Sequence, residues 1–372
     1  MTNQELFAKF ETWIDVAKWA PSGANAQNWE ATVSIVDDRV SVRLSLLNAG
    51  EANRSTMDTD GVASIAALGG FEFTLAAVAA NDGYAVTSRR LVASPSLAMG
   101  HVELEFSPSH EVRRRYANKE IRDRRTDRWP YSRRPLDQED LDALEAILRR
   151  YTNVVSRFFS NSTARSKGEL IPYLSNLEKL RWQNANLLNS LLHEISFGKE
   201  TEVAEDRIAS NQLGISKVEQ LLLRMLRRWT WLRRLMNLGF HVFAVYRATT
   251  VFVRQSDRIY FVSVSGAQVS FEACVELGAC LQELWLEAHH RGIAFQPLGL
   301  PLIAFSYSKN PGLLGLSDSQ SRSIVDLTKN FREVFDVDFR QPTIGFRVGL
   351  PFQSERALPP SHRRAVRILR LD

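Results

Sequence analysis

Cysteine is nearly absent from this sequence. Only Cys274 and Cys280 occur in 372 residues, so no disulfide framework can form, and their spacing is not that of zinc ligands. No stretch reaches the roughly 18 consecutive apolar residues that a membrane span requires. Residues 1–5 have neither the basic start nor the apolar run of a signal peptide. We therefore expect a cytoplasmic protein without a membrane span.

Common motifs of catalytic centres are missing as well. The sequence has no glycine-rich phosphate loop, no nucleophile elbow and no convincing pair of carboxylates for acid–base chemistry. His289 and His290 are adjacent, so on a helix they point about 100° apart, which is unsuitable for one metal ion. His193 and Glu194 are not followed by the second histidine of a zinc-protease motif. No metal site and no catalytic side chain are predicted.

Acidic residues are scarce in the second part of the chain. Residues 1–110 hold 7 Lys+Arg and 13 Asp+Glu, a net charge of −6, whereas residues 111–372 hold 40 and 29, a net charge of +11. The overall content is 44% hydrophobic and 24% charged, as in a folded globular protein of one or two domains. The basic part is therefore a candidate for binding an anion, a membrane surface or nucleic acid.

Hydrophobic periodicity predicts an α+β fold in two parts, with a boundary near residue 111, where an arginine-dense stretch begins. In the first part we expect helices at 5–19 and 61–82, a hairpin of strands at 31–37 and 40–46, and strands at 85–92 and 101–106. In the second part we expect helices at 137–150, throughout 164–240 and at 269–290, strands at 241–253, 258–264 and 342–350, and a basic tail.

Residues 61–86 and 269–296 share one pattern. In each, a long apolar helix ends at a glycine, Gly83 or Gly292, and a short strand follows. Two related halves explain this similarity, and so does chance similarity between two buried helices.

Four short segments carry polar groups suited to a ligand. The first holds Pro21, Ser22, Asn25 and Gln27 between a helix and a strand, with several hydrogen-bonding groups in a short span. Such a set suits the edge of a flat heteroaromatic ring. The alternative is an ordinary polar turn after a helix.

The second segment holds Arg124, Arg125, Thr126 and Arg128. Arginines beside a hydroxyl suit a phosphate, because guanidinium groups form charge-assisted hydrogen bonds to anionic oxygens. The alternative is a solvated basic face, partly neutralised by the neighbouring aspartates.

The third segment, Pro297-Leu298-Gly299, follows a predicted helix and strand, and its glycine allows close approach to a ligand. The fourth contains Arg363 and Arg364 near the end of the chain. Alone, the third reads as a plain turn and the fourth as a basic tail.

A further basic segment, Arg224–Arg234, includes Trp229 and Trp231. It could lie on an anionic membrane or on nucleic acid. The favoured interpretation is a packed helix whose arginines reach past aromatic surface to water.

Taken together, the order and identity of the four segments resemble the FMN-dependent nitroreductase superfamily, and most closely its long single-chain, Acg-like branch. The resemblance implies a nitroreductase-like α+β fold in which two fused halves form an intramolecular pseudo-dimer. Residues 1–110 would be the first half, and residues 111–372 the second, with 164–240 as a helical insertion or lid. In short members of the family the arginine motif precedes the Pro-Ser motif. The reversed order here implies that the first half supplies the part that a partner subunit normally gives.

The resemblance implies the role of each site residue. Arg124, Arg125, Thr126 and Arg363 or Arg364 would hold the phosphate and ribityl chain, and Arg128 would lie beside the N1–C2=O edge of the flavin. Pro21, Ser22 and Asn25 would meet the ring from across the interface, and Leu298 and Gly299 would lie near N5. Gln27 and Pro297 complete the implied cofactor-binding set. One FMN per chain is expected, because the first half lacks the arginine motif and the second half lacks the Pro-Ser motif. Asn28 before Trp29, and Asp58-Thr59-Asp60-Gly61-Val62, depart from the family pattern.

The implied function is an FMN-dependent oxidoreductase that passes a hydride from NAD(P)H through flavin N5 to a small acceptor. Two alternatives stay open: a protein that only binds or sequesters FMN, and a dedicated flavin dehydrogenase of a biosynthetic pathway. The expected partner is a small molecule, and nucleic acid binding is not favoured.

Overall fold

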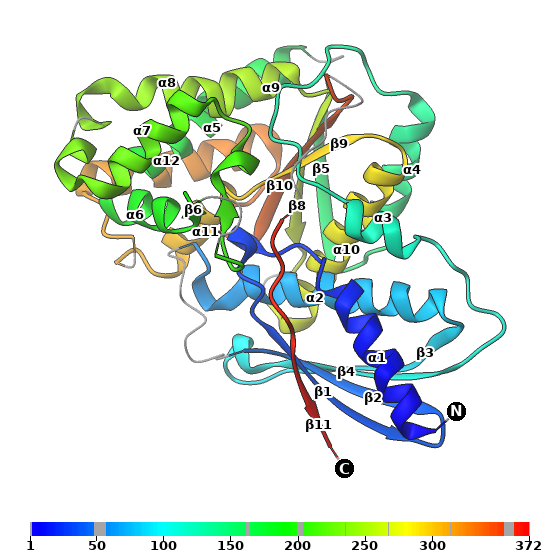
Figure 1. The fold of residues 1–372 in the computed structure, drawn as a ribbon. Helices are drawn as coiled ribbons and strands as arrows, with labels where there is room; N and C mark the ends of the chain where they lie inside the picture. Colours follow the sequence, from blue (N-terminus) through cyan, green and yellow to red (C-terminus); the bar gives the residue numbers. More distant parts are fainter. Residues whose placement is uncertain are drawn as a thin grey trace.

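The computed structural model describes residues 2–47, 57–160, 164–198, 204–234, 236–266, 268–312, 314–352 and 361–371. Two antiparallel sheet layers lie on either side of a central pair of long helices, α2 and α10, and a group of helices lies at one side (Figure 1). The mixed α+β content predicted from the sequence is confirmed.

The first part of the chain builds the lower sheet of Figure 1. Its elements are α1 (Asn3–Ala17), β1 (Trp29–Val36), β2 (Arg39–Leu46), α2 (Val62–Asn81), β3 (Tyr84–Val92) and β4 (His101–Pro108). The predicted helices, hairpin and strands are confirmed. In β1 and β2 buried residues alternate with more exposed ones, and α2 is apolar on nearly every side.

The second part builds the upper sheet. Its elements are α3 (Asn118–Asp123), α4 (Gln138–Leu148), β5 (Val154–Ser160), β8 (Arg258–Val264), α10 (Phe271–His290), β9 (Ala294–Leu298), α11 (Pro301–Lys309), α12 (Asp318–Phe335) and β10 (Thr343–Gly349). The predicted helices at 137–150 and 269–290 and the strands at 258–264 and 342–350 are confirmed. The sequence patterns did not predict α3, β5, α11 or α12.

The two sheets share one topology. Four strands of the first sheet have the order β1-β2-β4-β3, and the second sheet has the order β5-β8-β10-β9, with every neighbouring pair in these two sets antiparallel. In each, the central helix connects the second strand in sequence to the third. Gly83 and Gly292 end these helices with φ of +79° and +71°. The shared pattern read from the sequence therefore extends to the strand order of both parts.

The central helices α2 and α10 touch backbone to backbone. A Cβ atom placed on Gly278 would lie 1.6 Å from the carbonyl oxygen of Ala66, and one on Gly69 would lie 2.0 Å from the carbonyl oxygen of Val275. Gly69 lies three residues after Ala66, which Gly278 meets, and Gly278 lies three residues after Val275, which Gly69 meets. The contact between the two helices is therefore reciprocal. Only glycine at both positions permits this approach.

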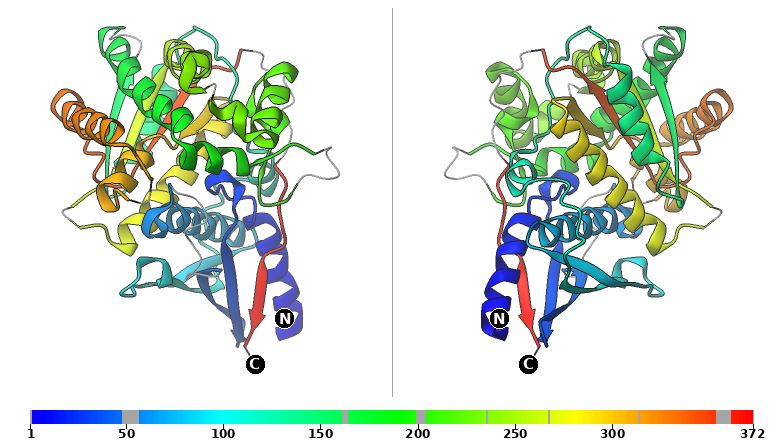
Figure 2. Two further views of the ribbon diagram at one scale, coloured as in Figure 1. Left: turned by 90° about the vertical axis from the view of Figure 1, so that its left-hand side faces the viewer. Right: turned by 90° about the vertical axis from the view of Figure 1, so that its right-hand side faces the viewer.

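The C-terminal segment returns to the first sheet. Strand β11 (Arg367–Arg370) pairs in parallel with β1, placing Arg367 opposite Glu30 (Figure 2). The prediction of a basic tail was wrong at this point. Alternation is hard to recognise over four residues, and pairing depends on an edge strand more than 300 residues away in the sequence.

The insertion between β5 and β8 is helical: α5 (Ala164–Gln183), α6 (Ala185–His193), α7 (Lys217–Arg228), α8 (His241–Val245) and α9 (Phe252–Gln255), with two-residue strands β6 (Ile195–Ser196) and β7 (Ile208–Ala209). Two π-helical segments, Met236–Phe240 and Tyr246–Val251, flank α8. The predicted strand at 241–253 was wrong. A continuous apolar, β-branched run suits a buried strand and a packed helix equally. Here the run packs against α5, and the hydroxyl groups of Thr249 and Ser175 form a hydrogen bond of 2.8 Å.

Among the described residues, one helical stretch, Thr59–Asn81, is long and apolar enough to cross a membrane by length and composition. Within that stretch, 78% of the apolar window is buried inside the protein, where α2 packs against α10.

Candidate functional site

A cavity of about 1130 Å³ lies where the two parts of the chain and the insertion meet. The first part contributes the turn after α1 and the start of α2. The second part contributes residues around Arg124, the end of β9 and Arg363, and α5–α9 contribute about half of the lining. No element alone encloses the cavity, so only the folded chain creates it.

The turn after α1 has an unusual backbone. Ala24, Asn25 and Gln27 adopt positive φ of 51°, 65° and 51°, which side chains other than glycine rarely accept. The hydroxyl of Ser22 helps to hold this conformation by accepting a hydrogen bond of 3.0 Å from the backbone N–H of Gln27. Pro21, Ser22 and Asn25 line the cavity.

Asn25 and Gln27 use their side-chain amides within the protein. The Asn25 amide nitrogen donates to the carbonyl oxygens of Glu205, Arg207 and His362 at 2.9–3.2 Å. The Gln27 amide nitrogen donates to Glu205, and its oxygen accepts from the backbone N–H of Arg364. These amides therefore join the turn to the insertion and to the C-terminal segment. Gln27 does not line the cavity.

Arg124 and Arg363 converge on one carbonyl group. Their guanidinium groups donate to the carbonyl oxygen of Trp19 at 2.9 and 3.3 Å. Arg363 also donates to the side-chain oxygen of Asn25, and the guanidinium of Arg124 lies 4.0 Å from the centre of the Trp285 ring. In the described part of the chain, neither arginine forms an ion pair with a carboxylate, and the Nε of each is buried without a partner.

Burial opposes the charge on this pair. Desolvation, followed by repulsion from Arg363 and Arg125, holds the pKa of Arg124 well below its ordinary value. Desolvation and the charge of Arg125 lower the pKa of Arg363 to about 10. Arg124 is buried and Arg363 is half-buried, neither has a carboxylate partner, and their repulsion would be relieved by an anion bound beside them.

The neighbouring residues of the arginine motif differ in placement. Thr126 and Arg128 line the main cavity, and Arg128 donates to the carbonyl oxygen of Gln212 at 3.0 Å. Burial lowers the pKa of Arg128 to about 10. Arg125 instead lines a separate pocket of about 10 Å³, and its guanidinium donates to the carbonyl oxygen of Arg124.

The segment after α10 forms another wall. Pro297 and Gly299 line the cavity, whereas Leu298 packs into the core beside α11. Arg347 on β10 supports this wall from behind, since its Nε donates to the side-chain oxygen of Gln296 at 2.7 Å. The Arg347 guanidinium is fully buried between the rings of Tyr131 and Phe252, at 3.8 and 4.1 Å from their centres.

Arg364 does not face the cavity. Its guanidinium donates to the carbonyl oxygen of Gln27, and so holds the turn after α1. Of the thirteen residues selected from the sequence, nine line the cavity: Pro21, Ser22, Asn25, Thr126, Arg124, Arg128, Pro297, Gly299 and Arg363. The other four, Gln27, Arg125, Leu298 and Arg364, lie beside it.

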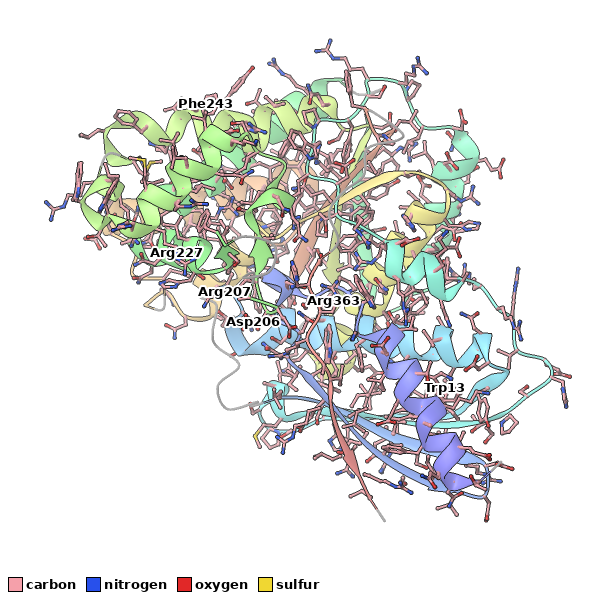
Figure 3. The ribbon with its side chains drawn as sticks, in the orientation of Figure 1. Trp13, Asp206, Arg207, Arg227, Phe243 and Arg363 are labelled. Atoms are coloured by element: carbon pink, nitrogen blue, oxygen red, sulfur yellow. The ribbon has the colours of Figure 1, made fainter. Side chains whose placement is uncertain are left out.

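Sequence reasoning missed two tryptophans and the contribution of the insertion. The Trp19 carbonyl organises the arginine pair, and the Trp285 ring supports Arg124. Trp19 comes directly before the Pro-Ser turn, which is a usable signal, whereas nothing in the pattern of α10 marks Trp285. Asp206 and Arg207 of the insertion also line the cavity and are labelled with Arg363 in Figure 3.

A buried carboxylate faces the cavity from the insertion. Glu178 on α5 is 1% exposed and accepts a hydrogen bond of 2.8 Å from the indole N–H of Trp182. Arg181 pairs with the same carboxylate oxygen. In the described residues, no group of three or more His, Cys, Asp or Glu side chains is placed to hold a metal ion.

No family model matches the sequence. No curated protein matches it either. Among solved structures, the chain is similar to the FMN-dependent nitroreductase NfnB from Mycobacterium smegmatis in complex with NADPH, with 12% identity over 64% of this chain and 92% of that chain and a TM-score of 0.32. It is also similar to the FMN- and NADPH-dependent nitroreductase NfnB from sphigopyxis sp. strain HMH, with 16% identity over 65% and 92% of the two chains and a TM-score of 0.30. Both TM-scores are below 0.5, so the function has to be inferred from this chain's own residues.

Proposed function

We propose that this chain is an FMN-dependent oxidoreductase of the nitroreductase type, built as an intramolecular pseudo-dimer. Residues 1–110 and 111–372 are its two halves, and the flavin binds in the cavity between them. The identical strand order of the two sheets and the reciprocal contact of α2 with α10 support the two related halves. Strand β11 crosses from the second half to the first half, as an exchanged arm would.

The observation that carries the proposal is the pair of buried Arg124 and half-buried Arg363. Both side chains line the cavity, both are held by the Trp19 carbonyl, and each keeps an unpartnered Nε donor. A phosphate accepts from both donors and neutralises the repulsion between them. The residues present therefore fit the phosphate end of FMN.

Bound FMN supplies hydride chemistry at N5, taking two electrons from NAD(P)H and passing them to an acceptor. The chain's own residues position and polarise the bound FMN. Arg124 and Arg363 hold the phosphate, and the charge of Arg128 stabilises negative charge at the N1–C2=O edge. Pro21 and Ser22 close one wall, and Pro297 and Gly299 close the opposite wall.

Asn25, Gln27 and Arg364 then act as positioning residues. Their side chains fix the turn after α1 to the insertion and to the C-terminal segment, which brings Arg363 to the cavity. The cavity, about 1130 Å³, exceeds the 300–1,000 Å³ typical of a pocket for one small ligand. Space therefore remains for a second molecule beside the cofactor.

A visible absorption spectrum with flavin counted per chain tests the proposal. We expect a yellow protein with one FMN per chain. Arg124→Met and Arg363→Met each remove one charge-assisted hydrogen bond, worth about 1.5–3 kcal/mol, so FMN should bind about 10- to 150-fold more weakly.

The matched control is Arg114→Met, because Arg114 is an exposed arginine outside the cavity. It should keep the FMN content of the unmodified chain. A colourless protein that cannot be loaded with FMN contradicts the proposal, and equal FMN affinity in all three variants contradicts the phosphate assignment.

One observation favours a second candidate, a protein that binds FMN without turnover. About half of the cavity lining comes from the insertion, which covers the site as a lid would. Stopped-flow mixing of the yellow protein with NADPH separates the two functions. Rapid bleaching of the flavin supports the oxidoreductase, and flavin that stays oxidised supports the store.

A further inference from the structure

The insertion has an exposed apolar face that the proposed flavin site does not explain. We define it by large apolar side chains of α7, α8 and the turns beside them, each 42–75% exposed: Val218, Leu221, Leu222, Trp229, Trp231, Leu238, Phe240, Val242, Phe243 and Tyr246. Figure 3 shows Phe243 at the outer side of the insertion, away from the central helices. Isolated apolar side chains on a surface are ordinary, whereas a concentration of this kind marks an interaction surface.

Helix α7 shows that the exposed apolar side chains are not the result of a loosely packed insertion. Leu223 and Leu226 turn inward and pack with α6 and α8 in a small core. Val218, Leu221 and Leu222 follow an i, i+3, i+4 spacing along the outer edge of the same apolar stripe, and all three are more than half exposed. The inner edge of the stripe therefore packs into the fold and its outer edge stays free.

The charge of the same segment is strongly positive. Residues 217–254 contain eight Lys+Arg and one Asp+Glu, a net charge of +7, although the whole chain carries only +5. The single carboxylate, Glu219, is paired with Arg247. Arg228 and Arg234 are exposed beside the two tryptophans.

We propose that this apolar face docks on an anionic lipid membrane surface. Leucine and phenylalanine side chains enter the boundary between headgroups and acyl chains, tryptophan favours that boundary, and arginines pair with lipid phosphates. A second copy of the chain is disfavoured as the occupant, because docking two identical faces would bring together two segments that each carry a net charge of +7 over residues 217–254. Nucleic acid would use the arginines but would leave the aliphatic side chains exposed.

The cavity reaches this face. Leu222, Phe240 and Phe243 are each more than half exposed, and all three also line the cavity that contains Arg124 and Arg363. When the face is docked, a molecule dissolved in the bilayer enters the apolar side of the cavity without crossing water. Docking itself does not depend on the proposed flavin chemistry.

Flotation of the purified full-length chain with vesicles tests the proposal. We expect binding to vesicles of phosphatidylcholine mixed with phosphatidylglycerol, and much weaker binding to phosphatidylcholine alone or at high salt. Arg228→Gln and Arg234→Gln should each weaken vesicle binding about fivefold. Leu221→Ser combined with Trp231→Ser should abolish it, and because neither residue lines the cavity, FMN content should stay unchanged.

The matched control is Val334→Ser combined with Phe352→Ser, which alters exposed apolar side chains outside the insertion and should bind vesicles normally. Absence of binding to anionic vesicles overturns the proposal. So does equal loss in the control variant, a dimer in light scattering that the Leu221/Trp231 variant converts to a monomer, or binding to duplex DNA in place of vesicles.

Discussion

The close contact of α2 and α10 makes Gly278→Ala a sharp test of the central architecture. The added Cβ would lie 1.6 Å from the carbonyl oxygen of Ala66, whereas real Cβ contacts are essentially never below 3.0 Å. The helices must therefore separate locally by about 1.4 Å. The opposing atom belongs to the backbone of a buried helix, so no side-chain rotation can relieve the clash.

The expected cost follows from this geometry. Overpacking in a well-packed core lowers the free energy of unfolding by about 1–3 kcal/mol and sometimes more. Because a backbone clash cannot be relieved by a side chain, we expect a loss of about 3 kcal/mol. The unfolding entropy of about 2.1 cal/mol/K per residue gives about 0.8 kcal/mol/K for a chain of this length, hence a decrease in Tm of about 4 °C. Ala66 and Gly278 also line the cavity, so FMN should bind more weakly in the same variant.

Thermal unfolding followed by circular dichroism measures the effect. The control is Gly168→Ala on α5, where a Cβ would have no atom within 4 Å. That substitution should be neutral or stabilise the chain by up to about 1 kcal/mol, since alanine favours the helix. A Tm for Gly278→Ala equal to that of the unmodified chain would refute the backbone contact and, with it, the reciprocal packing of α2 against α10.

Two further predictions concern the C-terminal segment and the charge of the arginine pair. Truncation after Arg364 removes β11 and exposes the edge of β1, so Tm and bound FMN should both fall; full flavin retention would show that Arg363 is positioned without β11. The pKa of Arg363 is lowered to about 10, and its protonated form is the one that holds an anion. Affinity of the flavin-free chain for inorganic phosphate should therefore be constant between about pH 8 and 9, where phosphate is already the dianion, and fall as pH rises through about 10. Calorimetric titration measures this, and an affinity unchanged up to pH 11 would contradict it.

Local patterns predicted the regular elements well. The hairpin of β1 and β2 follows from strict alternation, and α2 and α10 follow from long apolar runs that end in Gly83 and Gly292. The same reasoning failed at 241–253, because a β-branched apolar run has no periodicity that separates a strand from a packed helix. The surroundings of the run, chiefly α5, decided that segment.

The candidate site was also predicted only in part by local sequence patterns. Composition and order of the motifs selected nine residues that line one cavity. They could not separate ligand-facing groups from supporting ones, since Gln27 and Arg364 bind each other's backbone across more than 300 residues. Trp19 acts through its carbonyl group, which every residue has, so only its position just before the Pro-Ser turn, and not its residue type, was a usable signal.

By itself, the sequence determined the α+β content, the shared pattern of residues 61–86 and 269–296 and the excess of positive charge after residue 110. These properties depend on local hydrophobic periodicity and on counts of charged residues, which need no three-dimensional structure. Only the tertiary structure decided that Arg124 and Arg363 share one carbonyl, that α2 and α10 meet at two glycines, and that the apolar face of the insertion stays exposed. Each of these depends on contacts between segments far apart in the chain, where burial and unpaired charge are set by neighbours that no local pattern records.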